Sequence, residues 1–386
     1  MDPRFQPLPD ICSFATVRRP PGQPVLRTHF NDLNGMNDQS LPIPADAVPT
    51  HLARPWLVAD IGGTNARFGW LAEGSSTVAH VATLSVTAHA GPAEAARAYL
   101  AQLAEVLGAH AVVPRAAALA VATAVGQDQV SLTNSGWAFS RRAAQNDLGL
   151  DALLVLNDFE ALALSLPRLG TAQVRPITTP GATVAAASEV DGAENGALAV
   201  IGPGTGLGVA GLLPTRHGWM AVPGEGGHAT LAAGDDFEAA LLAAVRCDFP
   251  HVSAERLLSG IGLPVLHGAV ARVLGHAGVS LTAGDIVERG LAGTDAACQR
   301  TLDSFCALLG SFAGNVALVL GARGGVYIGG GIVPRLGETF FNSRFRECFE
   351  AKGRFQAYLQ AVPTFLITDT LAALSGAALA LEQHER

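Results

Sequence analysis

The sequence predicts an α/β protein with two related domains that face each other across a ligand cleft. Its 386 residues are too many for one average domain and suit two. Short apolar runs typical of buried strands alternate with longer segments of helical periodicity. A strand, a glycine- and threonine-rich turn and a second strand occur once in each half of the chain. A cleft between two such halves is a frequent site for a small substrate.

The first strand, turn and strand span residues 56–71. An apolar run leads into Asp60, and the turn consists of Gly62, Gly63, Thr64 and Asn65. Glycine tolerates the positive φ and the close backbone approach that such a turn can need. The turn would present backbone N–H groups and two polar side chains to a phosphate. Asp60 would reach a Mg²⁺ ion through water rather than by direct ligation. The alternative is an ordinary Gly-Gly hairpin.

The rest of the first half alternates strands with helices. Strands are expected at 77–86, 116–124, 129–133 and 152–156, the third pairing with the second, and helices at 93–107 and within 137–148. A further helix is expected to begin at Asn157 and Asp158, because both residue types are good N-caps.

Asp158 is the strongest candidate for catalysis. It follows a buried strand, so it is expected at the carboxyl end of a sheet, where ligands of α/β proteins bind. A carboxylate there can accept the proton of a substrate hydroxyl as the hydroxyl oxygen attacks phosphorus. The alternative is that Asn157 and Asp158 only cap the helix.

The second glycine-rich turn is Gly202-Pro-Gly204-Thr205-Gly206-Leu-Gly208. It follows a loop-like region at 170–196 and an expected strand at 197–201, and it precedes a strand at 209–213. Its glycines clear side chains from a phosphate site, to which Thr205 adds a hydroxyl. The spacing is not the dinucleotide G-x-G-x-x-G, and no helix follows, which disfavours a nicotinamide-binding fold. The alternative is a plain glycine-rich hairpin.

Glu225 and His228 flank two glycines. Such a loop can direct a carboxylate and an imidazole toward neighbouring hydroxyls of one sugar. The alternatives are a zinc pair, which lacks further ligands at useful spacing, and a surface loop. Glu255 is a weaker candidate, because an acid in its context is most often an exposed helix residue.

The remaining periodic segments complete the second half. Strands are expected at 219–222, 325–328 and 364–368, and helices at 235–246, 261–274, 283–291, 296–320 and 371–381. The second of these strands is followed by Gly329-Gly330-Gly331, a turn closed by Pro334. A flat adenine or a ribose could lie against these glycines, and close packing of a helix on the sheet explains them equally well.

Composition excludes several classes of function. The net charge of −8, without a basic cluster, argues against nucleic acid as a partner. The N-terminal region lacks the apolar segment of a secretory signal, and no uninterrupted apolar run could span a bilayer. The five cysteines have no paired spacing and are expected to be free thiols in a reducing compartment.

Lys352 is the only lysine, and its context fits neither a Walker A loop nor a protein kinase. Nucleotide phosphates would therefore be bound by backbone amides, glycines and Mg²⁺.

The order of these motifs resembles bacterial glucokinases of the non-ROK type. From about Trp56 to the C-terminus the chain carries Asp-x-Gly-Gly-Thr-Asn-x-Arg, Asn-Asp-Phe, Gly-x-Gly-Thr-Gly-x-Gly, Gly-Glu-Gly-Gly-His, Ser-Ala-Glu-Arg and Gly-Gly-Val-x-Ile-Gly-Gly-Gly. Thr133-Asn134 agrees as well. The resemblance implies the hexokinase–actin–Hsp70 fold. In this two-domain, actin-like ATPase (ribonuclease H-like) architecture, ATP and glucose lie between the domains.

The resemblance also implies the reaction and the roles of residues. The reaction is phosphoryl transfer from MgATP to the 6-hydroxyl of glucose, with Asp158 as general base. The implied glucose ligands are Asn157, Glu225, His228 and Glu255. The implied nucleotide-binding residues are Asp60 near Mg²⁺, the hairpins Gly62–Asn65 and Gly204–Gly206, and the Gly329–Gly331 turn at the adenosine.

The expected organisation is a disordered or loosely packed extension at 1–54, a small domain at 55–157 completed by 366–386, and a large domain at 158–365. The extension has no counterpart in the family, and translation could instead start at Met36. A cytoplasmic homodimer is expected. Zinc is not, because no cysteine-rich loop follows His228. Three alternatives stay open: a kinase for another hexose, a non-catalytic sugar-sensing protein, and an actin- or chaperone-like ATPase.

Overall fold

The computed structural model describes residues 54–386, apart from 124, 133–134, 180–195, 277–278 and 385–386. Residues 1–53 of the predicted extension, with Cys12 and Met36, lie outside the described residues, as do Thr133-Asn134 and most of the loop expected at 170–196. All described residues belong to one compact unit, Pro49–Arg386.

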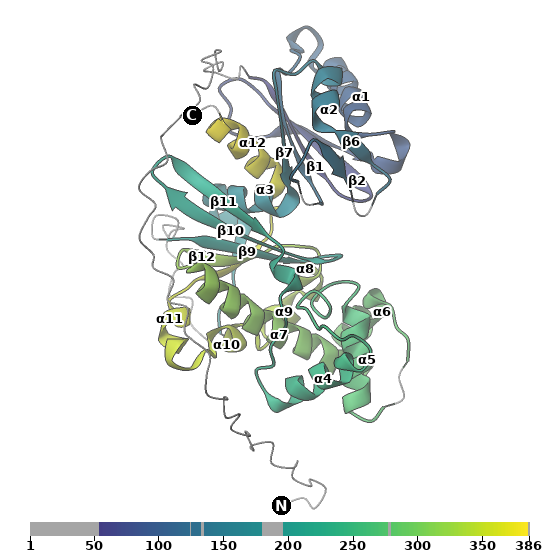
Figure 1. Cartoon of the computed structure of the whole chain (residues 1–386), viewed down its shortest axis with the longest axis vertical. Helices are drawn as coiled ribbons and strands as arrows, with labels where there is room; N and C mark the ends of the chain where they lie inside the picture. Colours follow the sequence, from purple (N-terminus) through teal and green to yellow (C-terminus); the bar gives the residue numbers. More distant parts are fainter. Residues whose placement is uncertain (1–53, 124, 133–134, 180–195, 277–278, 385–386) are drawn as a thin grey trace, which may run out of the picture. The chain divides into compact units, whose positions relative to one another are not determined.

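The first sheet has the strand order β3-β2-β1-β4-β7 (Figure 1). Its strands are β1 (Trp56–Ile61), β2 (Asn65–Leu71), β3 (Ala79–Ser85), β4 (Ala116–Val121) and β7 (Ala152–Asn157). β1 pairs antiparallel with β2 and parallel with β4, which in turn pairs parallel with β7. The carboxyl ends of β1, β4 and β7 therefore meet at one edge of the sheet, with Asp60 on the first and Asp158 just after the last.

Residues of β1 enter two different cores alternately, as expected for a strand that is buried on both faces. Four helices cover the sheet: α1 (Pro92–Leu107), α2 (Arg141–Leu148), α3 (Asp158–Ser165) and α12 (Ala372–His384). Leu57 and Ala59 share a core with residues of α1 and α2. Trp56 and Val58 share a core with residues of α3 and α12.

The second sheet repeats the plan of the first. Its order is β11-β10-β9-β12-β13-β8, built from β9 (Leu198–Pro203), β10 (Leu207–Thr215), β11 (Gly218–Gly224), β12 (Gly325–Ile328), β13 (Thr364–Ile367) and β8 (Val174–Pro176). β9 pairs antiparallel with β10 and parallel with β12, as β1 does with β2 and β4. The repeated strand, turn and strand of the sequence is therefore confirmed as a repeated sheet topology.

Helices α3 and α12 pack between the two sheets (Figure 1). One core cluster contains their buried residues together with Val58 of the first sheet and Leu198 and Val200 of the second. Gly376 of α12 comes very close to α3, because a Cβ built there would stand 1.7 Å from the carbonyl oxygen of Ala161.

The other face of the second sheet packs on a helical layer. This layer contains α4 (Asp236–Arg246), α5 (Leu263–Val273), α6 (Ala283–Ala292) and α7 (Ala296–Leu320). Asp295 caps α7 by accepting hydrogen bonds from the Ala297 and Cys298 N–H groups, and Gly321, with φ 61°, ends it. Lys352 donates a hydrogen bond from Nζ to Ser311 Oγ on α7, at 2.9 Å.

In the described part of the chain, α7 is the one helix that is long and apolar enough to cross a bilayer. However, 78% of its most apolar window is buried inside the protein. The helix therefore has the burial of a core helix. The four described cysteines, Cys247, Cys298, Cys306 and Cys348, are free thiols, as predicted.

Two predictions about local structure were wrong. The strand expected at 129–133 does not pair with β4; β5 (Gln129–Ser131) pairs instead with β6 (Ala138–Ser140), and its predicted last residue lies outside the described residues. Pro334 does not close a turn but stands in the first turn of α8 (Val333–Leu336), where its missing N–H costs no hydrogen bond. Three more short helices follow: α9 (Glu338–Phe341), α10 (Phe345–Glu350) and α11 (Gln356–Gln360).

Candidate active site

Asn157 is the N-cap of α3, so the capping alternative is confirmed for this residue. Its Oδ1 accepts hydrogen bonds from the N–H groups of Phe159 (2.9 Å) and Glu160 (3.3 Å). The Glu160 carboxylate accepts the Asn157 N–H in return, which completes a capping box. The Asn157 side-chain amide also donates to the carbonyl oxygen of Thr123 at 3.1 Å. A hydrogen bond from the Asn157 side chain also lowers the pKa of the Asp158 carboxyl group.

Asp158 occupies the first turn of α3, at the carboxyl edge of the first sheet. Burial raises the pKa of its carboxyl group to about 6, from an ordinary value of 3.8. The N–H of Phe159, which donates to Oδ1 at 2.9 Å, acts in the opposite direction, and the nearby charge of Asp60 adds to the rise. Asp158 is therefore a partly desolvated carboxylate that titrates near neutral pH.

Asp60 lies beside Asp158 and opposite Arg67 of β2. Burial raises the pKa of the Asp60 carboxyl, and the guanidinium of Arg67, 3.7 Å away, lowers it. The side chain of Asp60 is 25% exposed, so it still reaches the site. Arg67 was not among the predicted site residues, although it closes the Asp-x-Gly-Gly-Thr-Asn-x-Arg motif.

The first glycine-rich turn is a tight hairpin, as predicted. The Gly62 N–H donates to the carbonyl oxygen of Asn65 at 2.9 Å, and Thr64 and Asn65 are exposed. The expected positive φ is absent, because neither Gly62 nor Gly63 is among the described glycines with positive φ. A Cβ at Gly62 would stand 3.6 Å from the carbonyl oxygen of Asn65, which is an ordinary contact, so packing inside the turn does not require glycine at this position.

The second glycine-rich turn is shaped by its neighbours. The Gly204 N–H donates to the carbonyl oxygen of Gly206 at 2.8 Å, and the Gly204 carbonyl accepts the Gly260 N–H at 2.7 Å. A Cβ at Gly206 would stand 2.5 Å from Glu255 Oε2, whereas a Cβ at Gly204 would meet no atom within 4 Å. The missing side chain at Gly206 therefore makes room for a carboxylate of the protein itself.

Glu255 joins this turn to the loop of Glu225 and His228. One carboxylate oxygen accepts the Leu207 N–H at 2.9 Å, and the other lies 3.9 Å from His228 Nε2. The Glu255 N–H donates to the carbonyl oxygen of Gly227 at 2.8 Å. Glu225 Oε2 also lies 3.9 Å from His228 Nε2. Glu225 and His228 are exposed, whereas the side chain of Glu255 is only 25% exposed and lies in a turn, so the alternative of an exposed helix acid does not hold.

Gly329 and Gly330 follow β12. A Cβ at Gly330 would stand 2.4 Å from the carbonyl oxygen of Pro203, and its φ of 77° favours glycine. A Cβ at Gly329 would stand 3.0 Å from Leu162 of α3. Close packing therefore accounts for both glycines, as the packing alternative proposed.

The Phe159 side chain, which was not among the predicted site residues, connects the two halves of the candidate site. Its ring covers Gly202 and Gly208, which face each other across β9 and β10. The only signal in the sequence was the Asn-Asp-Phe motif, because the partner glycines lie more than forty residues away in the chain.

The oxygen-rich edge fits a hard cation. Two carboxylates, Asp60 and Asp158, lie close enough for one charge to affect the other, and carboxylates and water are the ligands that Mg²⁺ prefers. Among the described residues, no three His, Cys, Asp or Glu side chains converge in a way that could hold a metal ion by themselves. Shared ligation by protein, water and nucleotide phosphates is consistent with both observations.

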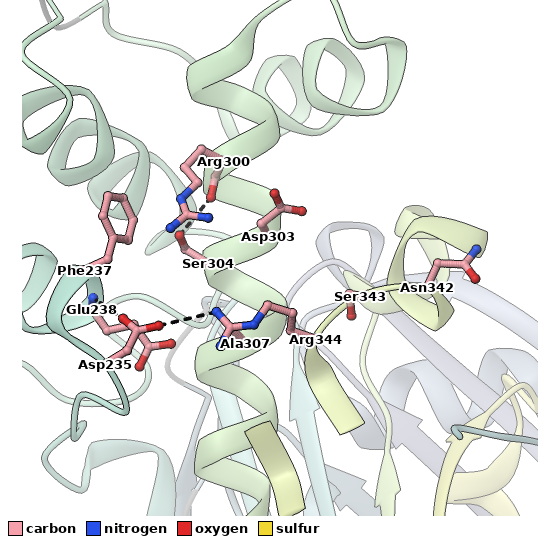
Figure 2. A pocket seen from close by; sticks show the side chains of 10 residues that line it. All are labelled: Asp235, Phe237, Glu238, Arg300, Asp303, Ser304, Ala307, Asn342, Ser343 and Arg344. Atoms are coloured by element: carbon pink, nitrogen blue, oxygen red, sulfur yellow. Dashed lines mark hydrogen bonds and ion pairs between the residues drawn. The ribbon is translucent and has the colours of Figure 1, made fainter. Parts of the chain in front are cut away.

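A separate cavity of about 170 Å³ lies between the start of α4, the first half of α7 and the turn after α9 (Figure 2). Figure 2 shows Arg300 and Arg344 on its wall, where Arg344 pairs with Asp235 at 3.4 Å. The guanidinium of Arg300 lies 4.1 Å from the centre of the Phe237 ring. None of the predicted site residues lines this cavity.

Comparison with known proteins assigns a family. A family model described as "Glucokinase" matches residues 57–384. A protein of Chromobacterium violaceum named glucokinase is 46% identical over 335 residues, covering 86% of this chain and 90% of that protein. A glucokinase of Aromatoleum aromaticum is 47% identical over 328 residues, covering 85% and 95%. The crystal structure of a glucokinase from an Antarctic psychrotroph superposes with a TM-score of 0.75 at 38% identity, covering 85% of this chain and 98% of that one.

Proposed function

The chain belongs to the glucokinase family and transfers a phosphoryl group from ATP to glucose, and we propose that Asp158 is the general base of this transfer. One observation supports this assignment above the others. Asp158 is a carboxylate at the carboxyl edge of the first sheet with a pKa of about 6. A base is most effective when its pKa lies near the working pH, because it is then ionised yet still basic.

The 6-hydroxyl oxygen of glucose attacks the γ-phosphorus of ATP while its proton moves to an oxygen of Asp158. A new oxygen–phosphorus bond forms, the bond between the γ-phosphorus and the bridging oxygen breaks, and ADP leaves. The proton then passes from Asp158 to solvent, which restores the carboxylate.

We propose that glucose is bound by Asn157, Glu225, His228 and Glu255, since these side chains can hold sugar hydroxyls from two sides. Asn157 contributes its side-chain amide, which already contacts Asp158. Glu255 contributes the oxygen that faces His228, because its other oxygen already accepts the Leu207 N–H. Carboxylates make short, strong hydrogen bonds to hydroxyls, so the acids supply most of the sugar affinity.

We propose that the hairpins at Gly62–Asn65 and Gly204–Gly206 bind the phosphates through backbone N–H groups, and that Gly329 and Gly330 face the adenosine. Asp60 would hold the waters of a Mg²⁺ ion, which supplies neutralisation of phosphate charge when bound. The presence of a single lysine in the chain supports this assignment, because it leaves the phosphates to amides and a metal ion.

The wider organisation is also proposed. The small domain (55–157 with 366–386) and the large domain (158–365) would close on the substrates and exclude water. This organisation would follow the hexokinase–actin–Hsp70 fold, and the enzyme would be of the non-ROK type. In support, α12 packs on the first sheet, far along the chain from its strands. A cytoplasmic homodimer is the proposed state of the enzyme.

A coupled assay of glucose 6-phosphate formation tests the base assignment. Asp158→Asn should lower kcat by about 10²- to 10⁴-fold and change the KM for glucose much less. Asp151→Asn, at the other end of β7 and exposed, is the matched control and should behave like the wild type. A kcat of Asp158→Asn near the wild-type value would overturn the assignment. A panel of hexoses, measured in the same assay, separates a glucose kinase from a kinase for another hexose.

A further inference from the structure

The Phe159 ring lies directly on the backbone of the second sheet. Gly202 of β9 and Gly208 of β10 are register partners, so they form a cross-strand pair. A Cβ at Gly208 would stand 2.0 Å from the ring, and a Cβ at Gly202 would stand 2.4 Å from it. Any side chain at either position would occupy the place of the ring. The pair Gly202 and Gly208 therefore forms the packing site, or seat, of one aromatic side chain. Such an aromatic ring over strand glycines is known to stabilise them.

The backbone of the same residue holds the catalytic end of α3. The Phe159 N–H donates to Asp158 Oδ1 at 2.9 Å and to Asn157 Oδ1 at 2.9 Å. Asp158 follows the last strand of the first sheet, whereas the ring is seated on the second. An aromatic side chain has only two rotatable bonds, so the position of the ring largely determines the position of the Phe159 backbone N–H group.

We propose that Phe159 is a positioning residue that fixes the distance between the Asp158 carboxylate and the β9–β10 turn that faces the phosphates. The proposal rests on the proposed role of Asp158 as general base. Phosphoryl transfer needs the attacking oxygen, the phosphorus and the base in one geometry, and a misplacement of about 1 Å can cost about 10²-fold in rate.

The glycines of the second turn therefore have different functions. Gly202 and Gly208 seat the ring of Phe159, and Gly206 makes room for the carboxylate of Glu255. A Cβ at Gly204 would meet no atom within 4 Å, so Gly204 is the glycine of the four with open space in front of it. The alternating glycines therefore serve two protein side chains as well as a phosphate.

A double-mutant cycle tests the proposal. Phe159→Leu shortens the ring side chain, and Gly208→Ala pushes the ring off its seat. Each variant should lower kcat by about 10- to 100-fold while the KM for glucose stays within about threefold, because the sugar ligands are not moved. In the double variant the new methyl group fills part of the space that the ring left. If the two substitutions acted independently, their fold-losses in kcat would multiply. The kcat of the double variant should be about fivefold or more above the value expected from that multiplication.

Leu164→Ala, on the same helix and buried, is the control for plain loss of packing. It should lower the melting temperature while leaving kcat near the wild-type value. Phe159→Met has about the volume of leucine, but its unbranched side chain reaches about as far as the ring. It should therefore recover part of the kcat lost in Phe159→Leu, and it provides the test if Gly208→Ala does not fold.

Two outcomes would overturn the proposal: kcat unchanged in Phe159→Leu although the melting temperature falls, or single effects that multiply without coupling. Failure of the base assignment would look different. In that case Asp158→Asn would stay active, and the coupling of Phe159 to Gly208 would still be measurable in the melting temperature.

Discussion

Gly376 of α12 faces the carbonyl oxygen of Ala161 of α3 so closely that a Cβ at position 376 would stand 1.7 Å from that oxygen. The two helices between the sheets therefore touch backbone to backbone. Since α3 begins at Asp158, this contact also supports the proposed base.

We predict that Gly376→Ala lowers the free energy of unfolding by at least about 2 kcal/mol, because the two helices must move apart. Chemical denaturation measures this change. Gly268→Ala is the matched control: it is also a helix-interior glycine, on α5, and its Cβ would meet nothing within 4 Å. The control should stabilise the protein by about 0.5–1 kcal/mol. Equal effects of the two substitutions would contradict the close contact.

We predict that kcat/KM for glucose falls tenfold per pH unit below about pH 6. The base must be ionised, and burial raises the pKa of Asp158 to about 6, with Asp60 adding to the rise. An ordinary aspartate would place this decline near pH 4. The pH profile, measured with buffers of constant ionic strength, decides between the two. An activity that stays flat down to pH 5 would show that Asp158 is not the titrating base.

We predict that Asp158→Asn is more stable than the wild type at pH 7. The folded-state pKa of Asp158 is raised, so its ionised form is penalised in the folded protein, and the cost amounts to about 3 kcal/mol above pH 6. The cost disappears as the pH falls below about 4, where the carboxyl group is protonated in both states.

The measurement is the free energy of unfolding of both proteins at pH 7 and at pH 4. The stability difference should be large at the higher pH and vanish at the lower one. Asp151→Asn, which only loses an exposed ion pair with Arg115, should change little at either pH. If the difference in unfolding free energy between Asp158→Asn and the wild type did not depend on pH, the effect would come from packing instead.

We predict that Glu255→Ala raises the KM for ATP as well as the KM for glucose, each by about 10-fold or more. Its carboxylate holds the Leu207 N–H beside the proposed phosphate turn while its other oxygen faces His228. Glu225→Ala is the comparison, because Glu225 is exposed and bonds to no atom of that turn in the described structure, so only the KM for glucose should rise. Equal KM values for ATP in the wild type and Glu255→Ala would refute the link.

Most of the fold was predictable because its strands and long helices have clear periodicities. The strand at Trp56–Ile61 and the helix at Ala296–Leu320 were found within a few residues of their observed ends. The short helices between 333 and 360 were missed, since elements of four to six residues span less than two helical periods and form through packing. The wrong partner of Gln129–Ser131 has the same origin, because three residues cannot specify a register.

The site was predictable where neighbours in sequence act together. Asn157 and Asp158 predict a helix N-terminus, and the strands on either side of Gly62–Asn65 predict a hairpin turn there. Phe159 was missed because its function depends on Gly202 and Gly208, which only the paired β9 and β10 bring under its ring. The half-buried position of Glu255 was missed for the same reason, since Leu207 lies far from it along the chain.

The hydrogen bond from Lys352 to Ser311 gives the protein an internal reporter of local opening. A lysine-specific endoprotease has one target in the whole sequence, and that side chain is half-buried against α7, with Nζ 2.9 Å from the Ser311 hydroxyl. Cleavage therefore requires the segment around α10 to detach from α7. A single new pair of fragments, followed over time, measures how often that happens without any label or engineered residue.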